Sequence, residues 1–121
     1  MAEKNPRVYL SDMVIACEKI IQYSQNRRVV DLIEDTLLFD AILRNLTVLG
    51  ETAGRFDRQW TSSHPEIPWG LVTGIRHRVV HDYGHVDPDI VWDTVQEDLP
   101  MILKKTAANL IGHGCQDPIT L

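Results

Sequence analysis

The stretch from residue 36 to residue 62, TLLFDAILRNLTVLGETAGRFDRQWTS, decides the fold. Its apolar residues recur three and four positions apart, which is the period of one face of an α-helix. The stripe consists of Phe39, Ile42, Leu46, Leu49, Ala53, Phe56 and Trp60. Asp35 or Thr36 can cap the start of this helix with a side-chain oxygen. The pattern predicts one long helix from about Thr36 to Ser62.

Two glycines, Gly50 and Gly54, lie one helical turn apart inside that stretch. Each costs about 1 kcal/mol relative to alanine in an exposed helix interior. Their presence indicates that a neighbouring helix approaches closely on their side.

The flanking sequence predicts three further helices, each opened by a proline in its first turn. The expected boundaries are Pro6 to Gln25, a short turn or helix at 29–33, Pro68 to about Tyr83, and Pro88 to about Leu110. Pro100 lies inside the last helix, where it removes one backbone hydrogen bond, so we expect a kink near Glu97 to Leu99. Since no strand-period segment and no internal repeat occurs, the sequence predicts an all-α, up-and-down antiparallel bundle of four main helices.

A chain of 121 residues suits one domain. We place this domain at residues 1–111 and expect 112–121, which lack helical periodicity, to form a flexible tail. The hydrophobic fraction of 44% and charged fraction of 24% are those of an ordinary soluble protein. No apolar run approaches the roughly 20 residues of a membrane span, and the first residues lack the apolar core of a secretory signal. We therefore expect a cytoplasmic protein that does not bind membranes.

The net charge and the cysteines argue against an unspecific nucleic-acid-binding protein and against a cysteine-based metal site or disulfide framework. The formal net charge of -5 does not favour a protein that binds nucleic acid through unspecific phosphate contacts, although a local phosphate site stays possible. Cys17 and Cys115 form neither a metal-ligand spacing nor a disulfide framework, so both are expected to be free thiols.

The chemically richest stretch is residues 74–87, GIRHRVVHDYGHVD, which holds three of the five histidines. Arginine grips a phosphate through a charged, bidentate fork, and histidine is the side chain best able to move a proton near neutral pH. RNA carries its own nucleophile, the 2′-hydroxyl beside each phosphate. Arg76 and His81 would therefore be a minimal set for cleaving RNA without a metal ion.

The spacing of these residues alone also allows roles other than RNA cleavage. Arginine and histidine at a helix end often only bind terminal carbonyl groups and the helix dipole. His77 and His81, four residues apart, would suit zinc, but no third ligand stands at a recognised spacing, and we expect no metal. Tyr83 could be a buried phenol with a bonded hydroxyl. Glu51 and Asn45 could be ordinary solvated positions.

The order of these residues resembles a known family. The pattern comprises Arg76, His81 and Tyr83, then Val86-Asp87, Ile90-Val91-Trp92 and Asp98-Leu99-Pro100, preceded by Arg44-Asn45-Leu46, Gly50-Glu51 and 65–69. It is similar to that of the HepT-like proteins of the HEPN superfamily, the toxin halves of MntA/HepT toxin-antitoxin pairs. The likeness covers nearly the whole chain.

The resemblance implies an all-helical homodimer that cleaves RNA without metal or cofactor in a cleft holding both copies of the motif. By motif match, Arg76 and His81 are expected to be catalytic. Tyr83 is expected to receive AMP from the partner antitoxin, a minimal MntA-like nucleotidyltransferase, which silences the toxin. His77, Glu51 and Asn45 are expected to support the catalytic pair.

Two positions depart from the family pattern. His77 stands where the family usually has another polar residue, so it is either a second proton carrier or an orienter of Arg76. Gly84-His85 replaces the usual aromatic-glycine pair, so the loop around Tyr83 is expected to differ in shape. A second hypothesis of another class is a non-catalytic helical partner that regulates a nucleotidyltransferase, which the acidic balance also suits.

Overall fold

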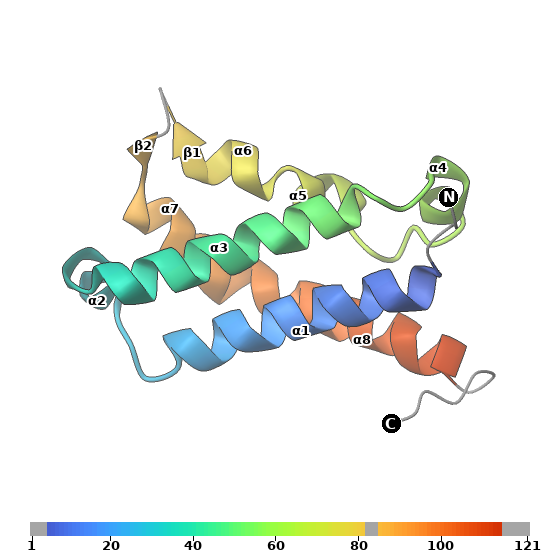
Figure 1. Cartoon of the computed structure of the whole chain (residues 1–121), viewed down its shortest axis with the longest axis horizontal. Helices are drawn as coiled ribbons and strands as arrows, with labels where there is room; N and C mark the ends of the chain where they lie inside the picture. Colours follow the sequence, from blue (N-terminus) through green and yellow to red (C-terminus); the bar gives the residue numbers. More distant parts are fainter. Residues whose placement is uncertain (1–4, 82–84, 115–121) are drawn as a thin grey trace.

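The computed structural model describes residues 5–81 and 85–114 of the chain. In chain order the elements are α1 (Pro6–Ser24), α2 (Val29–Glu34), α3 (Thr36–Ala53), α4 (Arg58–Ser62), α5 (Trp69–Thr73), α6 (Ile75–Val79), β1 (Val80–His81), β2 (His85–Val86), α7 (Pro88–Asp93), the π-helical turn η1 (Thr94–Asp98) and α8 (Leu99–Gly114). Successive long segments run back and forth along one axis (Figure 1). The predicted all-α, up-and-down bundle is therefore confirmed.

The core lies between α1, α3 and α8; α5 and α6 pack against α3, and α7 packs against α2 and α6 (Figure 1). The long helices and the short helices α5 and α6 all contribute apolar side chains that are fully buried. They include Leu10, Met13, Ile20, Ile42, Leu46, Leu49, Val72, Ile75, Leu99 and Ile102. The spacing of these residues is the three-and-four spacing read from the sequence, so burial of one face per helix accounts for the bundle.

The long helix ends earlier than the sequence predicted. It stops at Ala53, Gly54 caps it, and a new short helix starts after Asp57, whose carboxylate accepts a hydrogen bond from the backbone of Trp60 at 2.8 Å. The prediction of a continuous helix to Ser62 is wrong because the apolar spacing continues across the turn. Phe56 stays buried there among three aromatic rings without being helical.

The close approach expected at the two glycines occurs at only one of them. A β-carbon on Gly50 would lie 3.3 Å from the carbonyl oxygen of Val72 in α5, so the backbones of α3 and α5 nearly touch. At Gly54 the nearest atoms would be carbonyl oxygens of α3 itself, at ordinary contact distances. Gly50 therefore sets how near α5 lies to α3.

Where the sequence predicts a kink near Glu97 to Leu99, the structure has the five-residue π turn η1. The backbone N–H of Leu99 bonds to the carbonyl oxygen of Thr94, five residues back. The inner stripe consists of Val91, Val95, Leu99, Ile102, Thr106 and Leu110. It spans 19 positions (110 − 91) in five turns, whereas five α-helical turns take about 18. The π turn η1 holds more residues than an α-helical turn, and it accounts for the extra residue.

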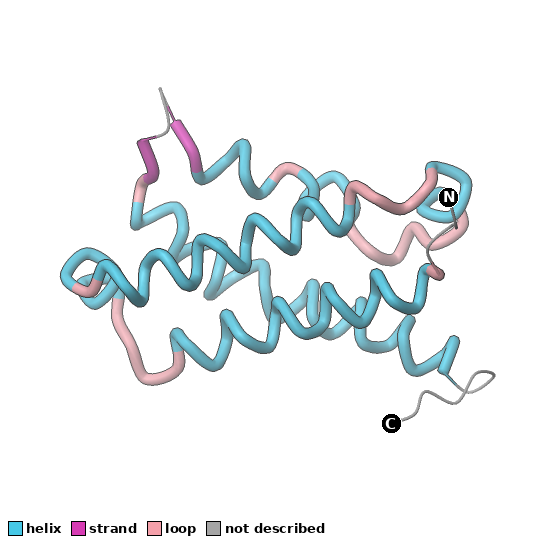
Figure 2. The backbone as a smooth tube through the Cα atoms, in the orientation of Figure 1, coloured by secondary structure: helices cyan, strands magenta, loops and turns pink. Residues whose placement is uncertain are grey.

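The sequence showed no strand-period segment, and the structure adds one short pair of strands, since β1 and β2 pair as a two-stranded antiparallel ribbon (Figure 2). α8 continues to Gly114, past the start of the expected tail at residue 112, and residues 115–121 lie outside the described part. Within the described ranges, no helix is both long and apolar enough to cross a membrane. Cys17 is a buried free thiol, and Cys115 is not among the described residues.

Candidate active site

The segment that carries the site is two short helices joined at one glycine. Gly74 caps the end of α5 and begins α6, and a β-carbon on it would lie 2.9 Å from the carbonyl oxygen of Gly70. A side chain at this position would therefore require the backbone to shift at the joint. Val72 and Ile75 are fully buried on either side of the joint. The segment is thus held against the core by its apolar side.

Arg76 and His77 lie on the outer side of this segment, and both side chains are exposed. Together with Thr73 and Val80 they line an open pocket of about 320 Å³. The four positions follow the spacing of one helical face across the Gly74 joint. Of the residues proposed from the sequence, the structure brings Arg76 and His77 together at one pocket.

The helix opens into extended backbone one turn before the sequence predicted. Val80 has φ −101° and ψ 120°, so α6 ends at Val79 and not near Tyr83. In the ribbon that follows, Val80 pairs with Val86 and His81 pairs with His85. The N–H of Asp87 donates to the carbonyl oxygen of Val79 over 3.4 Å, which ties the end of α6 to the start of α7.

This opening changes the geometry of the motif. Arg76 and His81 would lie roughly 140° apart around a regular helix. With α6 ended at Val79, His81 belongs to a strand and that angle no longer applies. The register also brings the backbone of His85 opposite that of His81, which the sequence pattern did not indicate. For His81 the structure describes the backbone, and Tyr83 lies outside the described residues.

The two polar residues of the long helix lie elsewhere. Asn45 donates its side-chain amide to the carbonyl oxygen of Ala41 in its own helix at 2.9 Å, and Glu51 is exposed in the last turn of α3. Neither lines the pocket of Arg76. Within residues 5–81 and 85–114, no three histidine, cysteine or acidic side chains are grouped so as to hold a metal ion.

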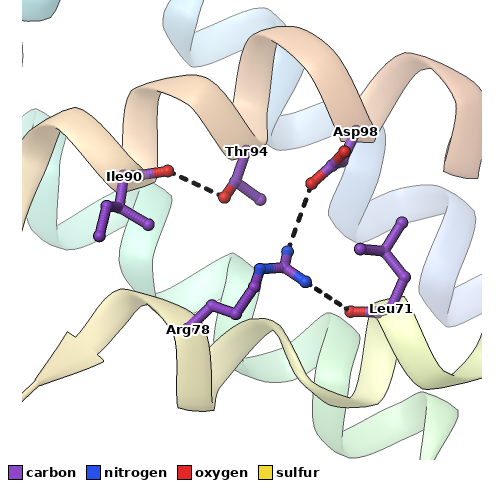
Figure 3. A network of polar contacts seen from close by, with 5 residues as sticks. All are labelled: Leu71, Arg78, Ile90, Thr94 and Asp98. Atoms are coloured by element: carbon purple, nitrogen blue, oxygen red, sulfur yellow. Dashed lines mark hydrogen bonds and ion pairs between the residues drawn. The ribbon is translucent and has the colours of Figure 1, made fainter.

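A contact that the sequence did not indicate involves Arg78 of α6, which does not line the pocket. Arg78 bonds to the carbonyl oxygen of Leu71 in α5 over 3.4 Å and to a carboxylate oxygen of Asp98 in η1 over 3.3 Å (Figure 3). The two charged residues are twenty positions apart, so no short spacing links them. Arg78 therefore joins the site segment to the last helical segment through side-chain contacts, in addition to the backbone bond between Asp87 and Val79.

Comparison with known proteins supplies the family. A family model described as "Ribonuclease HepT-like" matches residues 13–108, a range that includes Arg76, His81 and Tyr83. The chain belongs to the HepT-like ribonuclease family. The resemblance found in the sequence is thereby confirmed, and the protein is a member of a family of ribonucleases.

Two relatives illustrate how much of the HepT-like chain is shared. "Probable ribonuclease HepT" of Thermococcus cleftensis is 30% identical over 103 residues, which cover 85% of this chain and 94% of the relative. "Putative RNase TTE0752" of Caldanaerobacter subterraneus subsp. tengcongensis is 28% identical over 102 residues, covering 84% and 91%. No solved structure matches this HepT-like chain significantly.

Proposed function

We propose that this protein is the toxin of a toxin-antitoxin system and an endoribonuclease that needs no metal ion, with Arg76 and His81 as its catalytic residues. The observation that carries the proposal is the exposed Arg76 at the pocket on α6, in a HepT-like chain whose next element holds His81. Both residues lie on a segment whose buried side is fixed to the core. A site of this kind can be preorganised for one phosphate group.

The chemistry is an internal attack on the RNA backbone. The 2′-oxygen forms a bond to phosphorus while the bond between phosphorus and the 5′-oxygen breaks. A histidine must take the proton of the 2′-hydroxyl, and another must give a proton to the departing 5′-oxygen. A homodimer whose cleft holds two copies of His81 would supply both. Arg76 binds the phosphate and stabilises the negative charge that grows on its oxygens.

Cleavage of a labelled RNA by the purified protein, with and without a chelator, tests the activity. We expect cleavage that survives the chelator and is abolished in Arg76→Ala and in His81→Ala, while the circular dichroism spectrum stays unchanged. Arg58→Ala is the matched control, because Arg58 is exposed in α4, which lies at the end of the bundle away from β1 and β2 (Figure 1). Full activity in both motif variants would refute the site.

The same preparation separates the proposal from its alternative and tests the oligomer. Sedimentation should give twice the mass of one chain. A protein that binds a nucleotidyltransferase but leaves RNA intact under all conditions would instead be a non-catalytic regulatory partner.

We further propose that a cognate MntA-like nucleotidyltransferase in the same cytoplasm neutralises the toxin by adding AMP to Tyr83. A phosphate-bearing group two residues from His81 would occupy the place of the RNA phosphate. Co-expression should restore growth and increase the mass of the protein by one or more AMP groups. A Tyr83→Phe protein that is still neutralised through the activity of the antitoxin would contradict this step.

A further inference from the structure

Arg78 contacts three elements of the fold at once. Its backbone belongs to α6, one end of its guanidinium group reaches the Leu71 carbonyl of α5, and the other end reaches Asp98 of η1. In Figure 3 the Arg78 and Asp98 side chains point toward each other across the space between the two helical segments. The side chain therefore crosses from the site segment to the last helical segment.

Asp98 owes its place to the π turn. η1 is where the last helical segment takes up its extra residue, and Asp98 is the final residue of that turn. Thr94, at the start of the turn, is buried and donates its hydroxyl to the carbonyl oxygen of Ile90 at 2.8 Å (Figure 3). The turn is thus held at its first residue and presents a carboxylate at its last. Such π turns are frequent at functional sites.

The segment that Arg78 contacts is held on its apolar side by the buried Ile75 and Val79, and Arg78 adds a polar contact beside that side. α6 is five residues long, begins at the glycine joint and ends in extended backbone at Val80. A helix of this length is not stable on its own. Arg78 lies two positions after Arg76, or roughly 200° around the helix, so the two arginines face opposite sides. A tether on the Arg78 side therefore acts together with the buried Ile75 and Val79 to hold the rotation at which Arg76 and His77 face the pocket.

We propose that Arg78, held by Asp98 and the Leu71 carbonyl, is a positioning residue that completes the fixing of α6 and so aims Arg76 at the substrate phosphate. This inference rests on the proposed function, because it assigns to Arg78 an effect on the reaction that Arg76 performs. Arg78 itself does not touch the substrate in this arrangement. Its contribution is exerted entirely through the placement of α6.

The exposure of the pair separates positioning from simple stabilisation. The side chains of Arg78 and Asp98 are 36% and 29% exposed, and both contacts of Arg78 are long for hydrogen bonds. Ion pairs of this kind contribute little to global stability. Loss of the pair should hence leave the bundle folded and change the catalytic step.

The test compares Arg78→Met and Asp98→Asn with the parent in steady-state cleavage of a short RNA. We expect kcat to fall by at least about tenfold in each, as for a misplaced catalytic group, while KM changes by less than about twofold. The double variant should be no slower than the slower single one, because both remove the same contact. Arg78→Lys should recover part of kcat, since an ammonium group can replace one of the two contacts. Arg58→Met is the matched control and should retain the parent kcat.

A second readout does not depend on activity. Hydrogen exchange in Arg78→Met should accelerate at residues 75–81 and stay unchanged in α1 and α3. Parent-like kcat in both single variants, or exchange that accelerates across the whole bundle, would overturn the inference. A failure of the proposed function would differ, since Arg76→Ala and His81→Ala would then cleave like the parent.

Discussion

Gly50 in α3 lies so close to Val72 in α5 that a β-carbon on Gly50 would be 3.3 Å from the Val72 carbonyl oxygen. Because α5 continues through Gly74 into α6, this contact also sets the distance between the long helix and the segment that carries Arg76. The spacing of the core and the placement of the site thus depend on the same glycine.

Enlarging Gly50 should have graded effects. Gly50→Ala gains about 1 kcal/mol of helix propensity and loses a similar amount to crowding, so we expect a small net change. Gly50→Val should lower the free energy of unfolding by about 1–3 kcal/mol, because its methyl groups cannot fit. Urea unfolding measures both. Gly70→Ala is the control, since its β-carbon would meet nothing within 4 Å and should not destabilise. A fully stable Gly50→Val protein would contradict the close approach.

Gly74→Ala should affect activity more than stability. The new β-carbon would lie 2.9 Å from the Gly70 carbonyl oxygen, so α6 must shift relative to α5. We expect RNA cleavage to fall by about tenfold or more, because small displacements of a catalytic group are costly. Gly54→Ala serves for comparison, as its nearest neighbours would be at 3.5 Å and its φ of −75° suits alanine. Equal activity of the two variants would show that the joint is not tight.

Two buried threonines of the last helical segment should respond oppositely to valine. Thr94 donates to the Ile90 carbonyl oxygen, whereas the Thr106 hydroxyl, fully buried, has no hydrogen-bond partner among the described residues. Thr106→Val should raise the free energy of unfolding by about 1 kcal/mol, because it removes a desolvated polar group. Thr94→Val should lower it by about 1 kcal/mol through loss of the bond. Chemical denaturation of both variants measures these changes. Equal changes in the free energy of unfolding would contradict the different roles of the two hydroxyl groups.

Burial raises the pKa of the Cys17 thiol to about 12 from an ordinary value of 9.0, and the Glu18 carboxylate adds to the rise. The folded state therefore disfavours the thiolate. This contribution to stability is complete below about pH 9 and declines as the pH rises toward 12, by up to about 1.4 kcal/mol per pH unit.

Urea unfolding near pH 8 and near pH 10 should accordingly show a steeper loss of stability in the parent than in Cys17→Ala. The thiol should also resist labelling in the folded protein at neutral pH, with Cys115→Ser used to remove the other cysteine. Identical pH slopes in parent and variant would mean that Cys17 ionises freely when folded.

The helices that the sequence predicted correctly are those with local signals at their starts. Asn5 accepts a hydrogen bond from the Arg7 N–H, Asp35 from the Leu38 N–H, and Asp87 from the Asp89 N–H. Capping depends only on neighbouring residues, so it can be read from a single sequence. The ends were harder to predict. At Ala53 the apolar spacing continues through a turn, and at Val79 the chain enters strands of two residues, which are too short to show a period.

For the site, too, the residues with a local sequence signal could be predicted and those that meet only through packing could not. Arg76 and His77 could be found because they cluster in one short stretch, and they line one pocket. The Arg78–Asp98 pair could not, because the two residues meet only after two helical segments have packed. The π turn does have a signal in the sequence. The apolar stripe from Val91 to Leu110 takes 19 residues for five turns, which is more residues per turn than an α-helix has.

The π turn also determines where the chain tolerates a change in length. Deleting Gln96, which is exposed within the turn, would leave five ordinary turns, so the faces of α7 and α8 would stay aligned. Deleting Lys104, exposed in α8, would rotate the rest of that helix by about 100° and take Thr106 out of the core. Loss of a residue, normally among the most disruptive changes to a helix, should therefore be survivable at this one turn. Relatives of different length would be expected to differ there.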